Sequence, residues 1–321
     1  MISVDAPFFS EVAKGPSGGR AYWVNTEDDK KIRLGVWENG NKGTIVIFPG
    51  RAEYIEKYGI AAAGLAERGY STVAVDWRGQ GLTERLVQNK TVGHINDYSY
   101  YQNDVRALFN TINSLNLPKP LYLLAHSMGG CIGLRSLINE LPVNAAVFTS
   151  PMWGLSLSPF AQLGSLILSP LVRSGWFSTK TAPRRQSKNY VINTPFEKNI
   201  LTSCPDMYAV IRNQLSSYPE LILGGPTIGW IYESVKECQK LLSSLSPTTP
   251  SLVLIGSNEH IIDLSIIRKR IQQWDQSELT IIAEARHELI MEVEKIRQKT
   301  LDLTADFFNR HSNNLSYKLK G

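Results

Sequence analysis

The stretch Leu121-Tyr-Leu-Leu-Ala-His-Ser-Met-Gly-Gly130 decides the fold of this chain. It begins with a continuous apolar run, which is typical of a strand buried on both faces, and a segment with helical character follows. The turn between them, residues 125–129 (Ala-His-Ser-Met-Gly), matches the G-x-S-x-G nucleophile elbow with Ala in place of the first Gly. Small residues let strand and helix approach each other around a strained turn. The stretch therefore predicts Ser127 as a nucleophile at a helix N-terminus, where the helix dipole favours developing negative charge.

Around this elbow, apolar runs alternate with helix-like segments from residue 44 onward. The runs are Thr44–Phe48, Ser71–Asp76, Leu121–Ala125, Ala145–Thr149, Ser251–Ile255 and Leu279–Ile282. The helix-like segments include Tyr54–Arg68, Asp97–Asn113, Gly129–Ile138 and Val293–Asn309. This order predicts an α/β fold, with a mostly parallel central sheet and helices on both faces. Two earlier runs, Ala21–Asn25 and Ile32–Trp37, predict an antiparallel hairpin at the sheet edge.

The alternation stops between Pro151 and about Ser246, in a stretch rich in Leu, Ser, Pro and Trp. An insertion of this length between two strands of one sheet predicts a helical cap, inserted after the strand that ends near Thr149. We therefore expect a core of residues 1–150 and 247–321, and a cap, or lid, of residues 151–246. Apolar cap residues are predicted to bind substrate, or alternatively to form the cap's own core: Met152, Trp153, Phe160 and Trp230.

A serine nucleophile needs a base, and in this type of fold the order along the chain is serine, acid, histidine. Of five histidines, His287 follows the last predicted strand and is the predicted general base. The acid is expected in the loop after the Ser251–Ile255 strand. Glu259 is the preferred acid, and Asp263, four residues later, remains the alternative.

An oxyanion hole needs two backbone donors. The first is predicted to be the N–H of Met128, directly after the nucleophile. The second is predicted in the loop Phe48-Pro-Gly-Arg51, where Pro49 has no N–H and Arg51 can donate one.

With these residues, the chain resembles the bacterial lysophospholipases and monoacylglycerol lipases of the α/β-hydrolase superfamily, from about Ile32 to Phe308. The matching stretches are Pro49–Tyr54, Asp76–Thr83, Gly93–Tyr98, Asn199–Thr202, Gly224–Trp230, and His287 with Glu288 and Glu292. Four positions depart from the family pattern: Ala125 replaces Gly, Pro49 and Gln80 each replace His, and Glu259 replaces Asp. The resemblance implies the α/β-hydrolase fold and a serine hydrolase that uses no metal and no organic cofactor.

The composition agrees with a globular enzyme. Of the 321 residues, 43% are hydrophobic and 20% are charged, and the formal net charge of +5 comes from scattered Lys and Arg, which argues against a nucleic-acid partner. The N-terminus lacks the pattern of a signal peptide, and three cysteines form no disulfide framework, so we expect a cytoplasmic protein. The apolar stretch Pro159–Phe177, with Arg173, predicts a lip of the cap that touches a membrane surface transiently, or alternatively a segment whose side chains are buried against the main domain.

The sequence thus predicts a serine hydrolase that cleaves carboxylic esters of single-chain lipids, lysophospholipids or monoacylglycerols, through an acyl-enzyme. One alternative is a general carboxylesterase, amidase or peptidase on the same fold. An alternative of another class is a non-catalytic protein that binds a ligand on a hydrolase scaffold.

Overall fold

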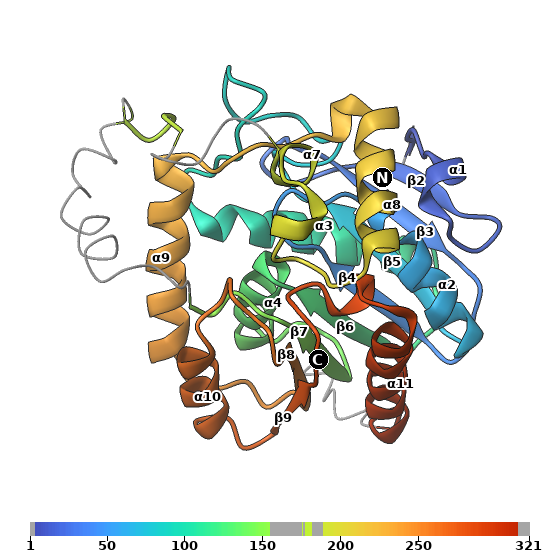
Figure 1. Cartoon of the computed structure of the whole chain (residues 1–321). Coiled ribbons are helices and arrows are strands. Elements are labelled where there is room, and N and C mark those ends of the chain that lie inside the picture. The colour runs from blue at the N-terminus through green and yellow to red at the C-terminus, as the bar shows by residue number, and fades with distance from the viewer. Residues whose placement is uncertain (1–3, 155–174, 176, 182–188, 314–321) are drawn as a thin grey trace.

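A single mixed sheet organises the protein (Figure 1). The structure, a computed structural model, describes residues 4–154, 175, 177–181 and 189–313. Within these ranges the sheet has nine strands in the order β1-β2-β3-β5-β4-β6-β7-β8-β9. Their bounds are β1 Val4–Asp5, β2 Arg20–Asn25, β3 Lys31–Trp37, β4 Thr44–Phe48, β5 Ser71–Asp76, β6 Leu121–His126, β7 Ala145–Thr149, β8 Ser251–Gly256 and β9 Ser277–Ile282. The strands from β5 to β9 in this order run parallel, whereas β1, β2, β3 and β5 pair antiparallel.

The six parallel strands and the β2–β3 hairpin confirm the predicted sheet. Every residue of β4 to β8 is buried. Successive side chains of a strand point to opposite faces, and along β4 Val46 and Phe48 join one apolar cluster while Ile45 and Ile47 join another. Both faces are therefore covered, which explains the continuous apolar runs. The short β1 was not predicted, because two residues carry no periodicity.

Helices cover the two faces of the sheet. The α-helices are α1 Ser10–Ala13, α2 Gly59–Glu67, α3 Tyr101–Ser114, α4 Met128–Ile138, α7 Tyr190–Asn193, α8 Pro205–Ser217, α9 Ile228–Ser243, α10 Leu264–Gln272 and α11 Glu294–Arg310. The 3₁₀ helices are η1 Ile55–Tyr58, η2 Tyr98–Tyr100, η3 Phe196–Lys198, η4 Pro219–Leu221 and η5 Leu289–Met291. Apolar residues of α3, α4 and α10 pack in one cluster, and those of α2 and α11 in the other. In Figure 1, α2 and α11 accordingly lie on the right of the sheet and α10 on the left.

The segment between β7 and β8 carries α7, α8 and α9. The two long helices in the described part of this segment separate in space (Figure 1), with α9 along the left side and α8 at the upper right. Trp230, Cys238 and Leu241 of α9 join the cluster of α3 and α4, whereas Tyr208 and Ile211 of α8 join the cluster of α2 and α11. The described part of the insertion therefore shares the core of the protein, and these apolar side chains do not form a core of their own.

A buried ion cluster holds the carboxyl end of β5 against the chain that follows β4. The guanidinium of Arg33 donates to Asp76 at 2.7 Å and to Glu56 at 2.8 Å, and all three side chains are fully buried. Asp76 also accepts from the backbone N–H of Ile55 and of Leu82. Asp76 thus positions the loops around the carboxyl ends of the strands.

Candidate active site

Ser127 lies in a sharp turn between β6 and α4. Its backbone has φ 49° and ψ −115°, a conformation that a residue with a side chain rarely adopts. Three hydrogen bonds hold the turn: Ser127 N–H donates to the Thr149 carbonyl at 3.1 Å, and the N–H groups of Met152 and Gly130 donate to the Ser127 carbonyl at 2.8 and 2.9 Å. The turn places the serine at the N-terminus of α4, where the first amides have no acceptor within the helix.

The close packing of α4 depends on its glycines, among them Gly129, which faces the end of β4, and Gly133, which faces β6. A Cβ atom at Gly129 would lie 2.0 Å from the Phe48 carbonyl oxygen, and one at Gly133 would lie 3.2 Å from the Cβ of Ala125. Ala125 occupies the position of the first elbow glycine, and Gly133 leaves the space that its methyl group needs. The departure from the G-x-S-x-G pattern is therefore accommodated locally.

The structure brings Ser127, His287 and Glu259 together. The Ser127 Oγ lies 3.0 Å from Nε2 of His287, and Nδ1 of His287 lies 2.7 Å from a carboxylate oxygen of Glu259. An ionised carboxylate can only accept, so Nδ1 carries the ring proton and Nε2 is the acceptor for the serine hydroxyl. This is the arrangement that a general base requires.

The surroundings of Glu259 favour its ionised form. Burial by itself raises its pKa, but the hydrogen bond and charge of His287, together with the N–H of Ile261, outweigh burial and lower the pKa to about 2. Gly256, the last residue of β8, lets the loop before His287 lie against it, since a Cβ there would be 2.2 Å from the Ala285 carbonyl oxygen. Asp263 instead caps α10 by accepting from the backbone N–H of Ser265 at 2.9 Å.

The loop after β4 crosses the N-terminus of α4, since Gly129 packs against the carbonyls of Phe48 and Pro49. In this loop, the N–H of Gly50 donates to Glu53 and that of Ala52 donates to the side chain of Gln80. The Nε2 of Gln80 lies 3.7 Å from the sulfur of Met128. Gln80, which replaces the His of the family pattern, therefore links the two segments that carry the predicted oxyanion donors, Arg51 and Met128.

The loop that carries His287 is fixed to the insertion. Arg286 donates to the carbonyls of Asn199 and Thr202 at 2.8 and 3.1 Å, and Glu288 N–H donates to the carbonyl of Leu201. Glu292 accepts from the N–H groups of Arg286 and Ser203, both at 2.9 Å. Except for the contact between Arg286 and Glu292, these contacts join residues more than eighty positions apart, and the sequence did not predict them. Their only signal was the resemblance at Asn199–Thr202 and Glu292.

The residues predicted to bind substrate lie in different surroundings. The backbone N–H of Met152 donates to the carbonyl of Ser127, which places Met152 next to that serine. Trp153 is buried against Phe148, and its indole N–H donates to the Gly130 carbonyl at 3.0 Å. Trp230 is buried in α9, with the guanidinium of Arg51 5.2 Å from its ring centre. Phe160 lies outside the described residues.

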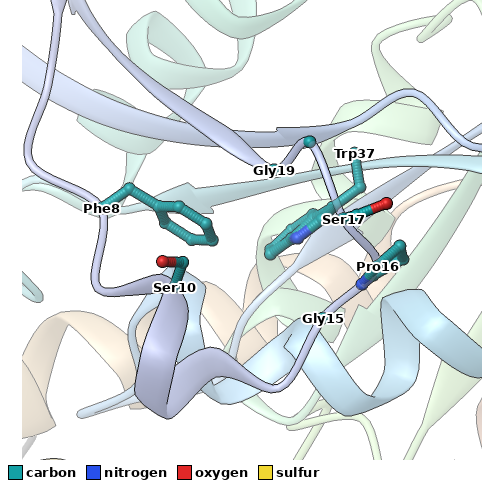
Figure 2. Close-up of a pocket in the computed structure, with 8 residues that line it drawn as sticks. Phe8, Ser10, Gly15, Pro16, Ser17, Gly19 and Trp37 are labelled. Atoms are coloured by element: carbon teal, nitrogen blue, oxygen red, sulfur yellow. The ribbon is translucent and has the colours of Figure 1, made fainter.

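A separate pocket of about 380 Å³ is lined by residues that precede β4 (Figure 2). They are Phe8, Ser10, Trp37 and residues 15–19. The lining includes serines but no histidine or carboxylate, so nothing in this pocket activates a nucleophile.

Comparison with known proteins agrees with the geometry. The family model described as serine aminopeptidase, S33, matches residues 39–294. Lysophospholipase L2 of Escherichia coli is 30% identical over 286 residues, which cover 84% of this chain and 81% of that protein. The probable lysophospholipase L2 of Haemophilus influenzae is 26% identical over 285 residues, 86% of each chain. A soluble variant of monoglyceride lipase from Saccharomyces cerevisiae, in complex with a substrate analog, superposes with a TM-score of 0.71 at 18% identity over 90% of this chain and 94% of that one. At that identity the likeness concerns the fold alone.

We expect Gly129→Ala to destabilise the elbow by roughly 3 kcal/mol, because the new Cβ meets backbone atoms that cannot move independently. Urea unfolding measures this loss. Gly18→Ala is the matched control, since its Cβ would meet nothing within 4 Å, and its positive φ alone costs about 1 kcal/mol. Equal urea midpoints for the two variants would contradict the close packing of Gly129 against the Phe48 carbonyl.

The acid is tested by a second pair of variants. Glu259→Gln should lower kcat for ester hydrolysis by about a hundredfold or more, because only the carboxylate fixes the tautomer of His287. Asp263→Asn should change kcat by less than about threefold, because Asn also caps helices well. The reverse order would assign the acid to Asp263.

Proposed function

The chain belongs to the serine aminopeptidase S33 family of α/β-hydrolases, and within this family we propose that it hydrolyses carboxylic esters of single-chain lipids, lysophospholipids or monoacylglycerols. The observation that carries the proposal is the hydrogen-bonded series from Ser127 through His287 to Glu259 at the N-terminus of α4. Similarity to lysophospholipase L2 over most of both chains supports the substrate class.

In the proposed reaction, Ser127 Oγ attacks the ester carbonyl carbon while its proton passes to Nε2 of His287. Glu259 stabilises the imidazolium that forms. The tetrahedral oxyanion accepts hydrogen bonds from the backbone N–H groups of Met128 and Arg51. The alcohol, a glycerol derivative, leaves with the proton from Nε2, and the acyl group remains on Ser127.

Deacylation repeats these steps with water. His287 takes a proton from a water molecule, which attacks the acyl carbonyl, and the free fatty acid leaves as Ser127 regains its proton. Every proton is held by a side chain of this protein, so the proposed reaction needs no metal or cofactor.

We assign residues 151–246 the role of a cap that admits the lipid and contacts the lipid surface. Four large apolar or aromatic side chains in the described part of this segment are exposed, Phe177 (39%), Tyr190 (41%), Ile200 (38%) and Leu245 (90%). The net charge of +5 favours an anionic surface. Apart from Gly175 and Phe177, the Pro159–Phe177 lip lies outside the described residues. None of the described helices is long and apolar enough to cross a membrane.

Replacing the nucleophile tests the proposed mechanism. Ser127→Ala should lower kcat for ester hydrolysis by at least about a thousandfold, while the melting temperature stays close to that of the wild type. A fluorophosphonate probe should label the wild type and not the variant. Labelling of the variant, or retention of more than about a tenth of the activity, would refute the assignment of Ser127.

The substrate class is tested by a screen. We expect hydrolysis of lysophosphatidylcholine, lysophosphatidylethanolamine or monoolein, and p-nitrophenyl esters of medium or long chains should exceed the acetate in kcat/KM. An amino-acid p-nitroanilide serves as the peptidase substrate. If it were cleaved faster than every lipid, the protein would be a peptidase, and labelling of Ser127 without any turnover would leave the ester proposal unsupported.

A further inference from the structure

Four charged or titratable side chains are buried together beside the candidate triad. Glu53, Lys57, His126 and Glu288 are each at most 5% exposed. They come from the loop after β4, from η1, from the end of β6 and from the loop after β9. The ammonium of Lys57 lies 2.5 Å from Glu53 and 2.7 Å from Glu288. We call these four residues the buried charge cluster.

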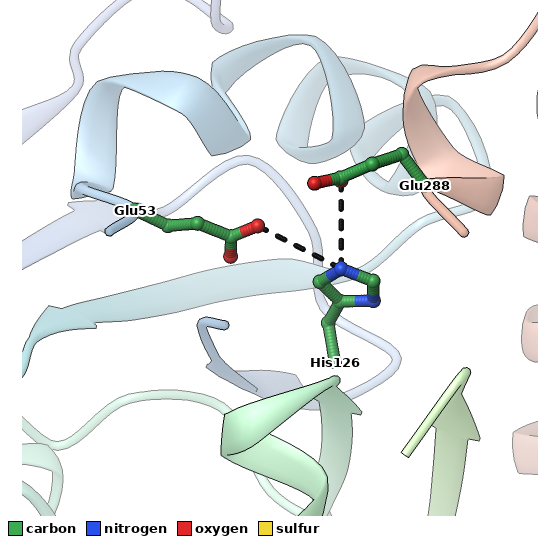
Figure 3. Close-up of side chains that lie close together, drawn as sticks. All are labelled: Glu53, His126 and Glu288. Carbon is green, nitrogen blue, oxygen red and sulfur yellow. Dashed lines mark ion pairs between the residues drawn. The ribbon is translucent and has the colours of Figure 1, made fainter. Parts of the chain in front are cut away.

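Both ring nitrogens of His126 face acceptors. Nδ1 lies 3.0 Å from the Thr149 carbonyl oxygen, which can only accept, so Nδ1 carries a proton. Nε2 lies 3.5 Å from an oxygen of Glu288 and 3.7 Å from one of Glu53, and Figure 3 shows the ring pointing at both carboxylates.

A proton on Nε2 of His126 would give the facing oxygen of Glu288 a hydrogen-bond donor. Within the described part of the chain, neither Nε2 of His126 nor the facing oxygen of Glu288 has another hydrogen-bond partner. A neutral ring would set the lone pair of Nε2 against the lone pairs of two carboxylates whose side chains are buried. Protonated, His126 joins Lys57 in balancing Glu53 and Glu288, and the buried charge cluster becomes neutral.

The direction of the pKa shifts agrees with this charge balance. Burial by itself lowers the pKa of His126, but the carboxylates of Glu288 and Glu53 outweigh burial, and the pKa is raised. Burial raises the pKa of Glu288, but Lys57 and His126 outweigh it, and that pKa lies well below its ordinary value. Tyr58, which donates to Glu53, remains neutral because burial raises its pKa.

The same side chains have the spacing of a metal site. Ligand atoms of Glu53, His126 and Glu288 all lie within 4.8 Å of one another. However, the ammonium of Lys57 already binds both carboxylates, and a divalent ion would need Nε2 deprotonated next to that ammonium. The geometry therefore favours a proton over a metal ion.

We propose that His126 is a permanently protonated positioning residue whose charge keeps the cluster beside His287 neutral. Its ring centre lies 5.0 Å from that of His287, and Glu288 is the next residue along the chain. The Thr149 carbonyl that accepts from Nδ1 also accepts from the N–H of Ser127. His126 thus acts on the base through charge and on the nucleophile through a shared acceptor. This role rests on the proposed function, since it concerns the pH at which His287 accepts a proton.

The pH dependence of the reaction tests this role. His126→Gln leaves two carboxylates with only Lys57 to balance them, and the excess negative charge favours protonated His287. The acid limb of kcat/KM for a soluble p-nitrophenyl ester should therefore move upward by about one pH unit. In the double variant His126→Gln/Glu288→Gln the cluster is neutral again, and the limb should return toward its wild-type position.

His94→Gln is the matched control, because His94 is also a buried histidine but faces Thr227 and Asn96 rather than carboxylates. It should leave the acid limb in place. An unmoved limb in His126→Gln, or a double variant that shifts as far as the single one, would overturn the proposal.

A second measurement does not depend on activity. Nitrogen-15 NMR of histidine-labelled wild type, assigned with the His126→Gln spectrum, should show both nitrogens of His126 protonated from about pH 6 to pH 9. Loss of a proton from the His126 ring within this range would refute the proposal. A stoichiometric divalent metal in the purified protein would also refute it. If instead Ser127→Ala kept its activity, the proposed function would fail while the protonation state of His126 would still be decided.

Discussion

The strained backbone of Ser127 is the constraint on which the rest of the site depends. A residue held in this region of φ and ψ costs of order 1–3 kcal/mol. Three backbone hydrogen bonds offset this cost at about 1 kcal/mol each, and they reach Thr149 at the end of β7 and Met152 in the chain after it. The turn is therefore stable only inside the assembled sheet, where β4 and β7 flank β6. The fold and the geometry of Ser127 therefore arise together.

The same turn decides where the residue before the nucleophile goes. With Ser127 presented to His287, the ring of His126 enters the interior, where it meets Glu53 and Glu288. Burying ions costs several kcal/mol each unless they are paired, and removing one partner of such a pair destabilises by about 3–5 kcal/mol. Because Glu53 follows β4 and Glu288 follows β9, the buried charge cluster connects the loop after β4 to the loop that carries His287. Electrostatic pairing thus sets the relative position of two loops that the backbone alone leaves independent.

Local patterns predicted most of the fold, since continuous apolar runs and the elbow each depend on neighbouring residues. The order of serine, acid and histidine predicted which side chains meet. The sequence left open which residue is the acid, because Glu259 and Asp263 follow the same strand. Asp263 precedes Leu264 and Ser265 at a helix start, and its capping role was a local signal that could have decided the matter. The cluster around His126 depends on contacts between four separate segments, and no local pattern encodes them.

Besides its proposed role as a cap, the insertion holds the loop that carries His287. Asn199 and Thr202 hold Arg286 through their carbonyls, and Glu292 binds the N–H groups of Arg286 and Ser203. The loop of His287 is therefore positioned by the segment that is proposed to select the lipid. Since the helices of this segment also share both apolar clusters of the core, it cannot be exchanged as an independent unit. Under the proposed function, a change in the insertion that alters which ester enters should also strain the hydrogen bonds that hold the loop of His287, so we expect selectivity and rate to be coupled.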